Sequence, residues 1–280
     1  MYPHIRIGSV VLGTHGITMG LAFVFAWKVL EANLRRHSLA ARLAEPIIFL
    51  VALAGIVGSR MYSALEAPSQ LLANPLNTIL SPNGYAWFGG LLAGMTTIWL
   101  LAKRFNMPAL MLMDLVSPCA ALGYGIGRLG CLLAGDGDYG AATSLPWGMS
   151  FPDGLVPTAQ FVHPTPIYEC LGSLLIFYYL WRVARIELAD GSILARYLVL
   201  TGVARFLVEF IRLNPRTILG LSNAQFVSLL SVAAALLLFG YNSPALRTTR
   251  GSKFAVPGNE CTSLRLQPKW RLARNSFWRS

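Results

Sequence analysis

The chain has 280 residues, of which 55% are hydrophobic and 12% are charged, and its mean hydropathy is +0.54. Soluble domains carry about 25% charged residues, so this composition excludes an ordinary soluble domain and indicates a protein dissolved in the bilayer. The formal net charge of +11 is of the kind found in nucleic-acid-binding proteins. At about 20 apolar residues per span, the length accommodates about six to eight transmembrane helices in one bundle.

The placement of the positive charge argues against a nucleic-acid arm. Eight lysines and arginines and one glutamate lie between Arg247 and Ser280, after the last apolar stretch. A basic segment beside a membrane is attracted to anionic headgroups, and a dense run of like charge favours disorder. We therefore expect a transmembrane domain over residues 1–245, a disordered cytoplasmic tail over residues 246–280, and no nucleic-acid partner.

The cysteines predict neither a disulfide framework nor a metal site. No pair has C-x-x-C or zinc-site spacing, and three of the four lie in apolar stretches. We expect no metal and no cofactor. Residues 1–10 lack the features of a cleavable signal peptide, so the first span is expected to remain in the mature protein. The cysteines are Cys119, Cys131, Cys170 and Cys261.

Apolar stretches recur along the chain at lengths that suit membrane helices. We predict an all-α integral membrane protein with seven transmembrane helices. The stretches are residues 11–30, 45–64, 85–102, 110–134, 167–184, 193–213 and 222–241.

The charges of the connections predict the orientation of the bundle. Basic residues follow the first, third, fifth and seventh stretches, which marks these connections as cytoplasmic. The connections over residues 67–84 and 135–166 contain no lysine or arginine, so we expect them to face the exterior. The N-terminus then lies outside and the C-terminus in the cytoplasm. The basic residues are Arg35, Arg36, Arg42, Lys103, Arg104, Arg182, Arg185, Arg196 and those of the tail.

Ionisable residues inside the apolar stretches are functional candidates, because a charge in the bilayer is costly. Arg60, Arg128 and Arg205 fall in the outer halves of their predicted helices, and Arg212 lies at a helix end. The planar guanidinium makes two parallel hydrogen bonds to a phosphate and stays charged when partly buried. We therefore expect the first three arginines to converge on an anion site in the outer leaflet.

Internal pairing is the alternative for these arginines. Glu209 lies four residues after Arg205 and three before Arg212, which is the spacing of neighbours on a helix. For Arg205, anion binding and a structural ion pair stay equally open. Arg128 has no acid three or four residues away, so we favour a functional role for it. We expect Asp114, in the same stretch, to cap a helix entry or to pair with Lys103.

Two further segments lie on the predicted outer side. Residues 135–148 read G-D-G-D-Y-G-A-A-T-S-L-P-W-G, in which glycines permit turns and aspartates can orient an arginine or a substrate hydroxyl. Residues 163–169 read H-P-T-P-I-Y-E. There Thr165 suits a helix cap, Pro166 the first turn and Glu169 a capping pattern, which leaves His163 and Tyr168 for chemistry.

His15 lies in the outer part of the first predicted span. A lone histidine of this kind is most often a packing residue. Its imidazole also titrates near neutral pH, so it is a candidate proton acceptor.

Five motifs together resemble the prolipoprotein diacylglyceryl transferases. They are G-S-R-M-Y at 58–62, F-G-G-L at 88–91, G-R-L-G-C at 127–131, H-P-T-P-I-Y-E at 163–169 and R-F-L-V-E-F-I-R at 205–212. The resemblance implies a seven-span transferase of the bacterial inner membrane that acts in lipoprotein biosynthesis. Such an enzyme moves the diacylglyceryl group of phosphatidylglycerol onto the lipobox cysteine of a preprolipoprotein and releases glycerol phosphate.

The resemblance also implies roles for individual residues. Arg128 and Arg205 take the essential arginine positions, and the partners would be phosphatidylglycerol, the signal peptide with its lipobox, and membrane lipids. The expected catalytic set is His15, Arg128, His163, Tyr168 and Arg205. The expected phospholipid-binding set is Arg60, Gly89, Gly90, Arg128, Asp136, Arg205, Glu209 and Arg212.

The chain differs from the family pattern at three positions. Phe88 stands where the H-G-G-L motif has histidine, Cys131 where the G-R-x-G-N motif has asparagine, and His15 where the first span has tyrosine. These differences keep two alternatives open. One is a relative that binds or moves phospholipid without the chemistry. The other is a relative that lipidates a different acceptor.

Overall fold

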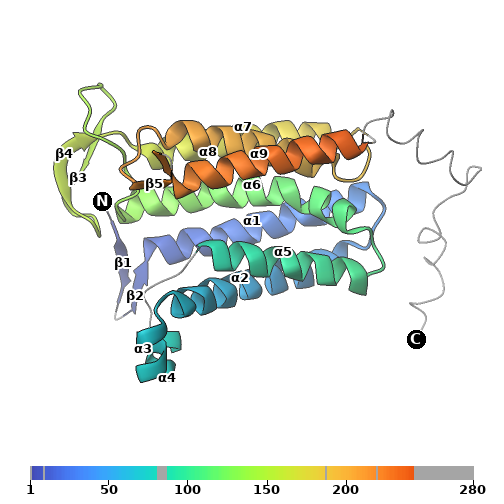
Figure 1. Cartoon of the computed structure of the whole chain (residues 1–280), viewed down its shortest axis with the longest axis horizontal. Helices are drawn as coiled ribbons and strands as arrows, with labels where there is room; N and C mark the ends of the chain where they lie inside the picture. The colour runs from blue at the N-terminus through green and yellow to red at the C-terminus, as the bar shows by residue number, and fades with distance from the viewer. Residues whose placement is uncertain (1, 9, 81–86, 187, 219, 243–280) are drawn as a thin grey trace, which may run out of the picture.

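The computed structural model describes residues 2–8, 10–80, 87–186, 188–218 and 220–242. In these ranges, seven helices of 17 to 26 residues lie side by side and alternate in direction (Figure 1). They are α1 (Thr14–Arg36), α2 (Ala44–Glu66), α5 (Trp87–Arg104), α6 (Ala109–Ala134), α7 (Thr165–Val183), α8 (Ser192–Val208) and α9 (Asn223–Asn242). The predicted tail over residues 246–280 lies outside the described residues.

Each predicted apolar stretch overlaps one of these helices, so the predicted helical fold is confirmed. Four segments are long and apolar enough to cross a membrane, and large apolar side chains such as Phe25, Phe49 and Leu237 are exposed on the bundle. Such a surface suits lipid rather than water. The chain is therefore a multi-pass membrane protein. The four segments are Thr14–Arg36, Ala41–Glu66, Ala109–Ala134 and Asn223–Gly240.

The boundaries of two predicted spans are wrong. The first begins as a strand, because β2 (Val10–Gly13) pairs antiparallel with β1 (His4–Ile7) before α1 starts. The sixth ends at Val208, and the following turn brings Arg212 into a backbone bridge with Gly140. The contact between Arg212 and Gly140 is a tertiary contact, and such contacts override a local helical pattern.

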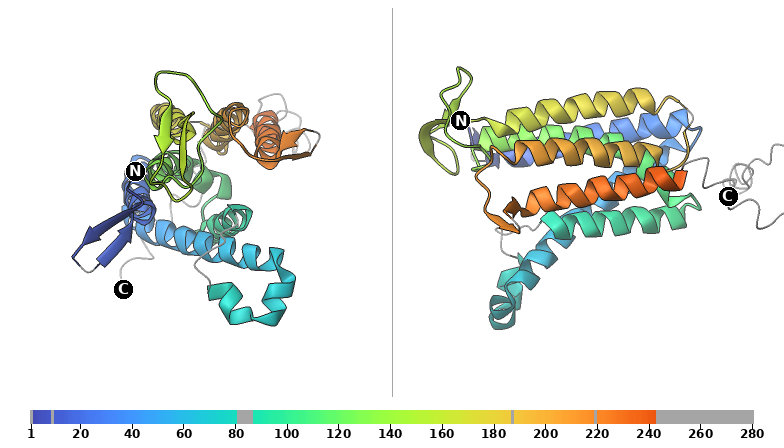
Figure 2. Two further views of the ribbon diagram at one scale, coloured as in Figure 1. Left: turned by 90° about the vertical axis from the view of Figure 1, so that its left-hand side faces the viewer. Right: turned by 45° about the horizontal axis from the view of Figure 1, so that its top comes forward.

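Small elements that the sequence did not predict cover one end of the bundle, hereafter the hairpin end. Figure 1 shows the three hairpins and the two short helices there, and Figure 2 shows α3 and α4 on the side away from β3 and β4. Connections from distant parts of the chain therefore lie close together at the hairpin end. These elements are β1 with β2, β3 (Met149–Phe151) with β4 (Thr158–Val162), β5 (Arg216–Ile218) with β6 (Leu221–Ser222), α3 (Pro68–Ala73) and α4 (Pro75–Leu80).

The opposite end is closed by apolar packing and basic helix ends. Leu30, Leu34, Ile47 and Leu112 are fully buried in one cluster shared by α1, α2 and α6. Basic residues occupy the last turns of α1, α5 and α7, where they complement the negative end of the helix dipole. The short 3-10 helix η1 (Ala41–Leu43) joins α1 to α2 at this end.

Asp114 of α6 fixes the start of α8. Its two carboxylate oxygens accept backbone N–H bonds from Gly191 and Leu194, both at 2.7 Å. Because the first N–H groups of a helix have no partner inside it, this carboxylate replaces a local cap. The expectation of a helix-entry cap is confirmed, although the helix is α8 rather than the one that carries Asp114.

Candidate active site

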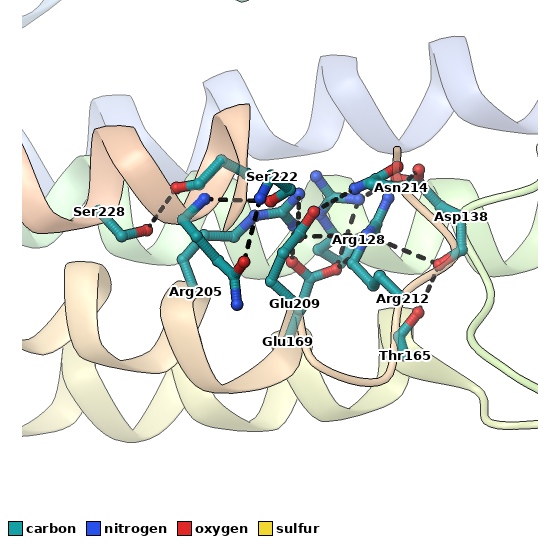
Figure 3. A network of polar contacts seen from close by, with 12 residues as sticks. Arg128, Asp138, Thr165, Glu169, Arg205, Glu209, Arg212, Asn214, Ser222 and Ser228 are labelled. Carbon is teal, nitrogen blue, oxygen red and sulfur yellow. Dashed lines mark hydrogen bonds and ion pairs between the residues drawn. The ribbon is translucent and has the colours of Figure 1, made fainter. Parts of the chain in front are cut away.

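Three arginines from separate segments meet at the hairpin end. Arg128 lies near the end of α6, Arg205 in the last turn of α8, and Arg212 in the turn after α8. Figure 3 shows them pointing toward one another with Glu169 and Glu209 between them. The motifs of α6 and α8 therefore meet in space, as the sequence predicted for Arg128 and Arg205.

Glu169, near the start of α7, connects all three arginines. Its side chain is only 4% exposed. Its carboxylate pairs closely with Arg205 Nη1 and lies 3.5 Å from Arg128 Nη1 and 3.2 Å from Arg212 Nη1. The hydroxyl of Tyr124 also donates a hydrogen bond to it at 2.7 Å. One buried carboxylate thus positions donors from three segments of the chain.

Asp138, in the loop after α6, bridges two of the arginines. Its Oδ2 pairs with Arg128 and its Oδ1 with Arg212, and its side chain is 30% exposed. Burial by itself would raise the pKa of this carboxyl, but Arg128 and Arg212 outweigh it, so the pKa of Asp138 lies below its ordinary value. Asp138 therefore stays ionised and holds the two guanidinium groups together.

Glu209 completes the network from the C-terminal end of α8. It lies 3.1 Å from Arg205 Nη2 and 3.7 Å from Arg212 Nε, and Asn214 donates a hydrogen bond to its Oε1 at 2.5 Å. Its side chain is fully buried. The structural ion pair that the spacing of Arg205 and Glu209 left open is present, and both arginines belong to the wider cluster as well.

The charges of this arginine cluster cancel, because three guanidinium groups face three carboxylates. Buried charges are stable only when they are paired and hydrogen-bonded. Each guanidinium carries five N–H donors, so the arginines can also bind a further anion. Asp138 is the most exposed of the three acids, and an incoming anion would displace it at the smallest cost.

The expected capping pattern at the start of α7 is only partly correct. Pro166 does lie in the first turn, but no side-chain cap bond is made at Pro164. Thr165 instead donates its hydroxyl hydrogen bond to the backbone carbonyl of Asp138. Glu169 serves the arginine cluster rather than the cap, since the ion pairs are stronger interactions than a neutral capping bond.

His163 and Tyr168 form a second polar group beside α7. The Tyr168 hydroxyl lies 3.3 Å from His163 Nδ1 and accepts a hydrogen bond from Trp147 Nε1 at 2.8 Å. Both side chains are partly exposed. The two residues therefore lie together as a pair that can share a proton, and their expected part in the chemistry stays a prediction.

His15 and Asp136 lie where α1 approaches the end of α6. His15 is exposed at the second position of α1, and a Cβ placed on Gly130 of α6 would lie 3.1 Å from its Nδ1. Asp136 accepts the backbone N–H of Asp138 at 3.2 Å. Asp138 is thus the aspartate whose carboxylate reaches the arginines, and the assignment of Asp136 to phospholipid binding stays a prediction.

Arg60, Gly89 and Gly90 lie in the half of the bundle formed by α2 and α5. Arg60 donates a hydrogen bond to the backbone carbonyl of Thr78 in α4, so it joins α2 to the short helices. The expected meeting of Arg60 with Arg128 and Arg205 is therefore not seen among the ion pairs of the described residues, and Arg212 is the third arginine of the cluster. A Cβ on Gly89 would clash with the backbone of Gly58, and one on Gly90 would lie 3.1 Å from the carbonyl oxygen of Gly55. Both glycines permit close packing of α2 against α5, and a lipid-binding role for these residues stays a prediction.

Sequence reasoning missed several partners of the arginines. Glu169, Asp138, Tyr124 and Asn214 hold the cluster together. Of these, Glu169 is the one that lies far from the arginines in the sequence. The signal that could have revealed Glu169 was its place as an acid inside the H-P-T-P-I-Y-E motif. The sequence analysis interpreted this acid as part of a helix cap instead. Phe88 lies in the first turn of α5.

Comparison with known proteins identifies similar chains over most of this length. The family model described as prolipoprotein diacylglyceryl transferase matches residues 4–241. Phosphatidylglycerol–prolipoprotein diacylglyceryl transferase of Clostridium tetani is 34% identical over 70% of this chain and 80% of its own length. The proteins of the same name from Paracidovorax citrulli and Bordetella avium are 32% and 31% identical, over 85% and 84% of this chain and 96% and 92% of their own lengths.

Proposed function

The chain belongs to the prolipoprotein diacylglyceryl transferase family, and we propose that its arginine cluster is the site where phosphatidylglycerol reacts. The enzyme transfers the diacylglyceryl group of this lipid to a prolipoprotein, which is a step of lipoprotein maturation. The proposal rests chiefly on one observation: Arg128 of α6 meets Arg205 and Arg212 from the end of α8, and all three share the buried carboxylate of Glu169.

The reaction places its main electrostatic demand on the phosphate. The sulfur of the acceptor cysteine attacks the glyceryl carbon that is bonded to the phosphate oxygen. A C–S bond forms, the C–O bond breaks, and its electron pair leaves with glycerol phosphate while the thiol proton passes to a base. The leaving phosphate therefore gains negative charge as the bond breaks. Donors that meet this charge stabilise the transition state more than the ground state.

The arginine cluster supplies such donors at the right place. Asp138 bridges Arg128 and Arg212 with its two carboxylate oxygens, and a phosphate can make the same pair of contacts with two of its oxygens. The phosphate of the lipid would replace the carboxylate of Asp138, while Glu169 and Glu209 keep the guanidinium groups in position. The glycines of the loop allow Asp138 to move aside.

Proton transfer is assigned to the histidines and to Tyr168. The His163 and Tyr168 pair lies on the segment that leads into α7, and His15 lies at the start of α1. A thiol with a pKa of about 8.5 is a few per cent thiolate at pH 7, so a base contributes less here than it does in serine chemistry. This is why phenylalanine at position 88, where the family motif has histidine, is compatible with activity.

The topology follows from the bundle and its charges. We assign all seven long helices to the membrane, because α5, α7 and α8 lie side by side with the four segments that meet the length and hydropathy criteria and alternate in direction with their sequence neighbours. The basic helix ends at the end opposite the hairpins would face the cytoplasm. The arginine cluster and the N-terminus would then face the outer leaflet of the bacterial inner membrane.

The proposal is tested with purified protein, phosphatidylglycerol carrying a labelled acyl chain, and a lipobox peptide. Mass spectrometry of the peptide should show a diacylglyceryl thioether, with one glycerol phosphate released per modified peptide. Lipid binding without thioether would instead favour a relative that binds lipid without the chemistry. Label on a different acceptor would identify a different protein substrate.

A further inference from the structure

Three potential metal ligands meet beside the arginine cluster. A ring nitrogen of His15, the Sγ of Cys131 and a carboxylate oxygen of Asp136 all lie within 4.8 Å of one another. They come from the start of α1, the last turn of α6 and the loop after it. We propose that these three side chains bind a divalent cation of the zinc class.

The fold builds this arrangement from distant residues, so the spacing rules for metal sites in sequences do not detect it. Gly130 has no side chain, and this lets α1 approach α6 until Thr18 and His15 lie against it. Gly135 ends α6 in the left-handed conformation with φ of 59°, and Gly137 follows with φ of 91°. These two glycines turn the loop back, so Asp136 returns toward Cys131.

The ligand types select the metal. Zinc prefers nitrogen, sulfur and carboxylate oxygen, at bond lengths of about 2.0–2.3 Å. Tetrahedral ligands at those bond lengths lie up to about 4 Å apart, so small side-chain rotations from the present separation would complete the site. Three protein ligands leave a fourth position for water. A hard cation such as magnesium would not favour the thiolate.

Two of the three proposed ligands can be reached by an ion from solvent. His15 is exposed and Asp136 is partly exposed, whereas Cys131 is only 8% exposed. The ion would therefore approach from the hairpin end and displace the thiol proton of Cys131 on binding. Two of the three ligands, His15 and Cys131, are also positions where this chain departs from the family pattern.

The site touches the arginine cluster at two points. Arg128 Nη1 lies 3.9 Å from the Sγ of Cys131, and Asp136 accepts the backbone N–H of Asp138 at 3.2 Å. Cys131 and Asp136, which contact Arg128 and Asp138, would then be ligands of the metal. When His15 is bound to the metal, proton transfer in the proposed reaction rests on His163 and Tyr168. Metal binding does not depend on the proposed reaction, because the affinity for the metal can be measured without lipid or peptide.

The test is titration of the full-length protein in detergent with Co²⁺, followed by competition with Zn²⁺. We expect one ion per chain, an absorption band from a thiolate bound to cobalt, and release of a proton. Cys131→Asn should abolish the band, and His15→Tyr and Asp136→Asn should weaken binding by about tenfold or more. The matched controls Cys170→Ala and Cys261→Ser should keep both the band and the affinity.

A second measurement needs no variant and is independent of folding defects. Alkylation of the wild-type thiols with and without Zn²⁺ should show protection of Cys131 and unchanged labelling of Cys261. No cobalt–thiolate band in the wild type, or equal labelling of Cys131 with and without zinc, would overturn the proposal. Binding that survives Cys131→Asn would also overturn it, since the metal would then be held elsewhere.

Discussion

The guanidinium of Arg205 in α8 pairs through Nη1 with the buried carboxylate of Glu169 in α7. The two residues are 36 positions apart in the sequence, so this ion pair links α7 to α8 within the arginine cluster. The same carboxylate also faces Arg128 and Arg212. The cluster therefore stabilises the fold, and it is also the proposed site for the phosphate of the lipid.

Glu169→Gln should destabilise the protein strongly. It removes the carboxylate that three arginines share and leaves an excess of buried positive charge, at a cost of about 3–5 kcal/mol. The measurement is thermal unfolding in detergent. The control is Glu31→Gln, which removes exposed pairs with Lys28 and Arg35 and should change stability far less, because exposed ion pairs are screened by water and salt. Equal effects of the two substitutions would contradict a structural role for Glu169.

Asp138→Asn should strengthen the binding of phosphatidylglycerol while it lowers the stability of the protein. The amide keeps the shape of the side chain but lowers the negative charge between Arg128 and Arg212, so the phosphate of the lipid meets less competition. We expect the KM for phosphatidylglycerol to fall while the unfolding temperature also falls. Asp153→Asn, at an exposed loop position, serves as the control and should change neither value. A higher KM in Asp138→Asn would show that the carboxylate assists lipid binding rather than competing with it.

The contribution of Asp138 to stability should also depend on pH. Its pKa in the folded protein is below the ordinary value, so its stabilisation is fully present above the unfolded pKa of about 3.9. The contribution is lost as the pH falls through the lower folded pKa. The difference in unfolding free energy between the wild type and Asp138→Asn should therefore be constant between pH 5 and 7 and shrink below about pH 3.9. A difference that grows toward acid would contradict the ion pairs.

Two glycines of α6 should respond to alanine in opposite directions. A Cβ on Gly130 would meet Thr18 and His15 of α1, whereas one on Gly123 would have no atom within 4 Å. Gly130→Ala should therefore cost about 1–3 kcal/mol through overpacking. Gly123→Ala should be neutral or stabilise by up to about 1 kcal/mol, because alanine favours helix more than glycine. Thermal unfolding of both variants, compared with the wild type, measures this contrast.

The sequence predicted the helices well because their signal is local. Apolar stretches of membrane length identify each helix, and Pro166 marks the first turn of α7. Two predicted ends were wrong for different reasons. Val11 pairs with Arg6 in a local hairpin, which the apolar character of the stretch did not reveal. Arg212 leaves the helical pattern to bridge with Gly140, a partner in a distant loop that no local pattern contains.

The sequence predicted the arginines of the candidate site and their neighbour Glu209, but not the roles of Glu169 and Asp138. An arginine inside an apolar stretch is conspicuous, so Arg128 and Arg205 were identified directly. Glu169 was missed because a carboxylate three residues after a proline also suits a helix start, and Asp138 because two aspartates share one loop. Which of these acids faces an arginine depends on how α6, α7 and α8 pack, and that information is not local.

The most direct test of the central claim is the transfer rate of Arg128→Ala and Arg205→Ala, measured with labelled phosphatidylglycerol and a lipobox peptide. If these arginines meet the charge of the leaving phosphate, each substitution should lower kcat by about 10²–10³, and lysine should restore only part of it. Arg182→Ala, at the last turn of α7 at the opposite end of the bundle, should keep wild-type activity. Folded Arg128→Ala and Arg205→Ala proteins that transfer the lipid at the wild-type rate would contradict the account.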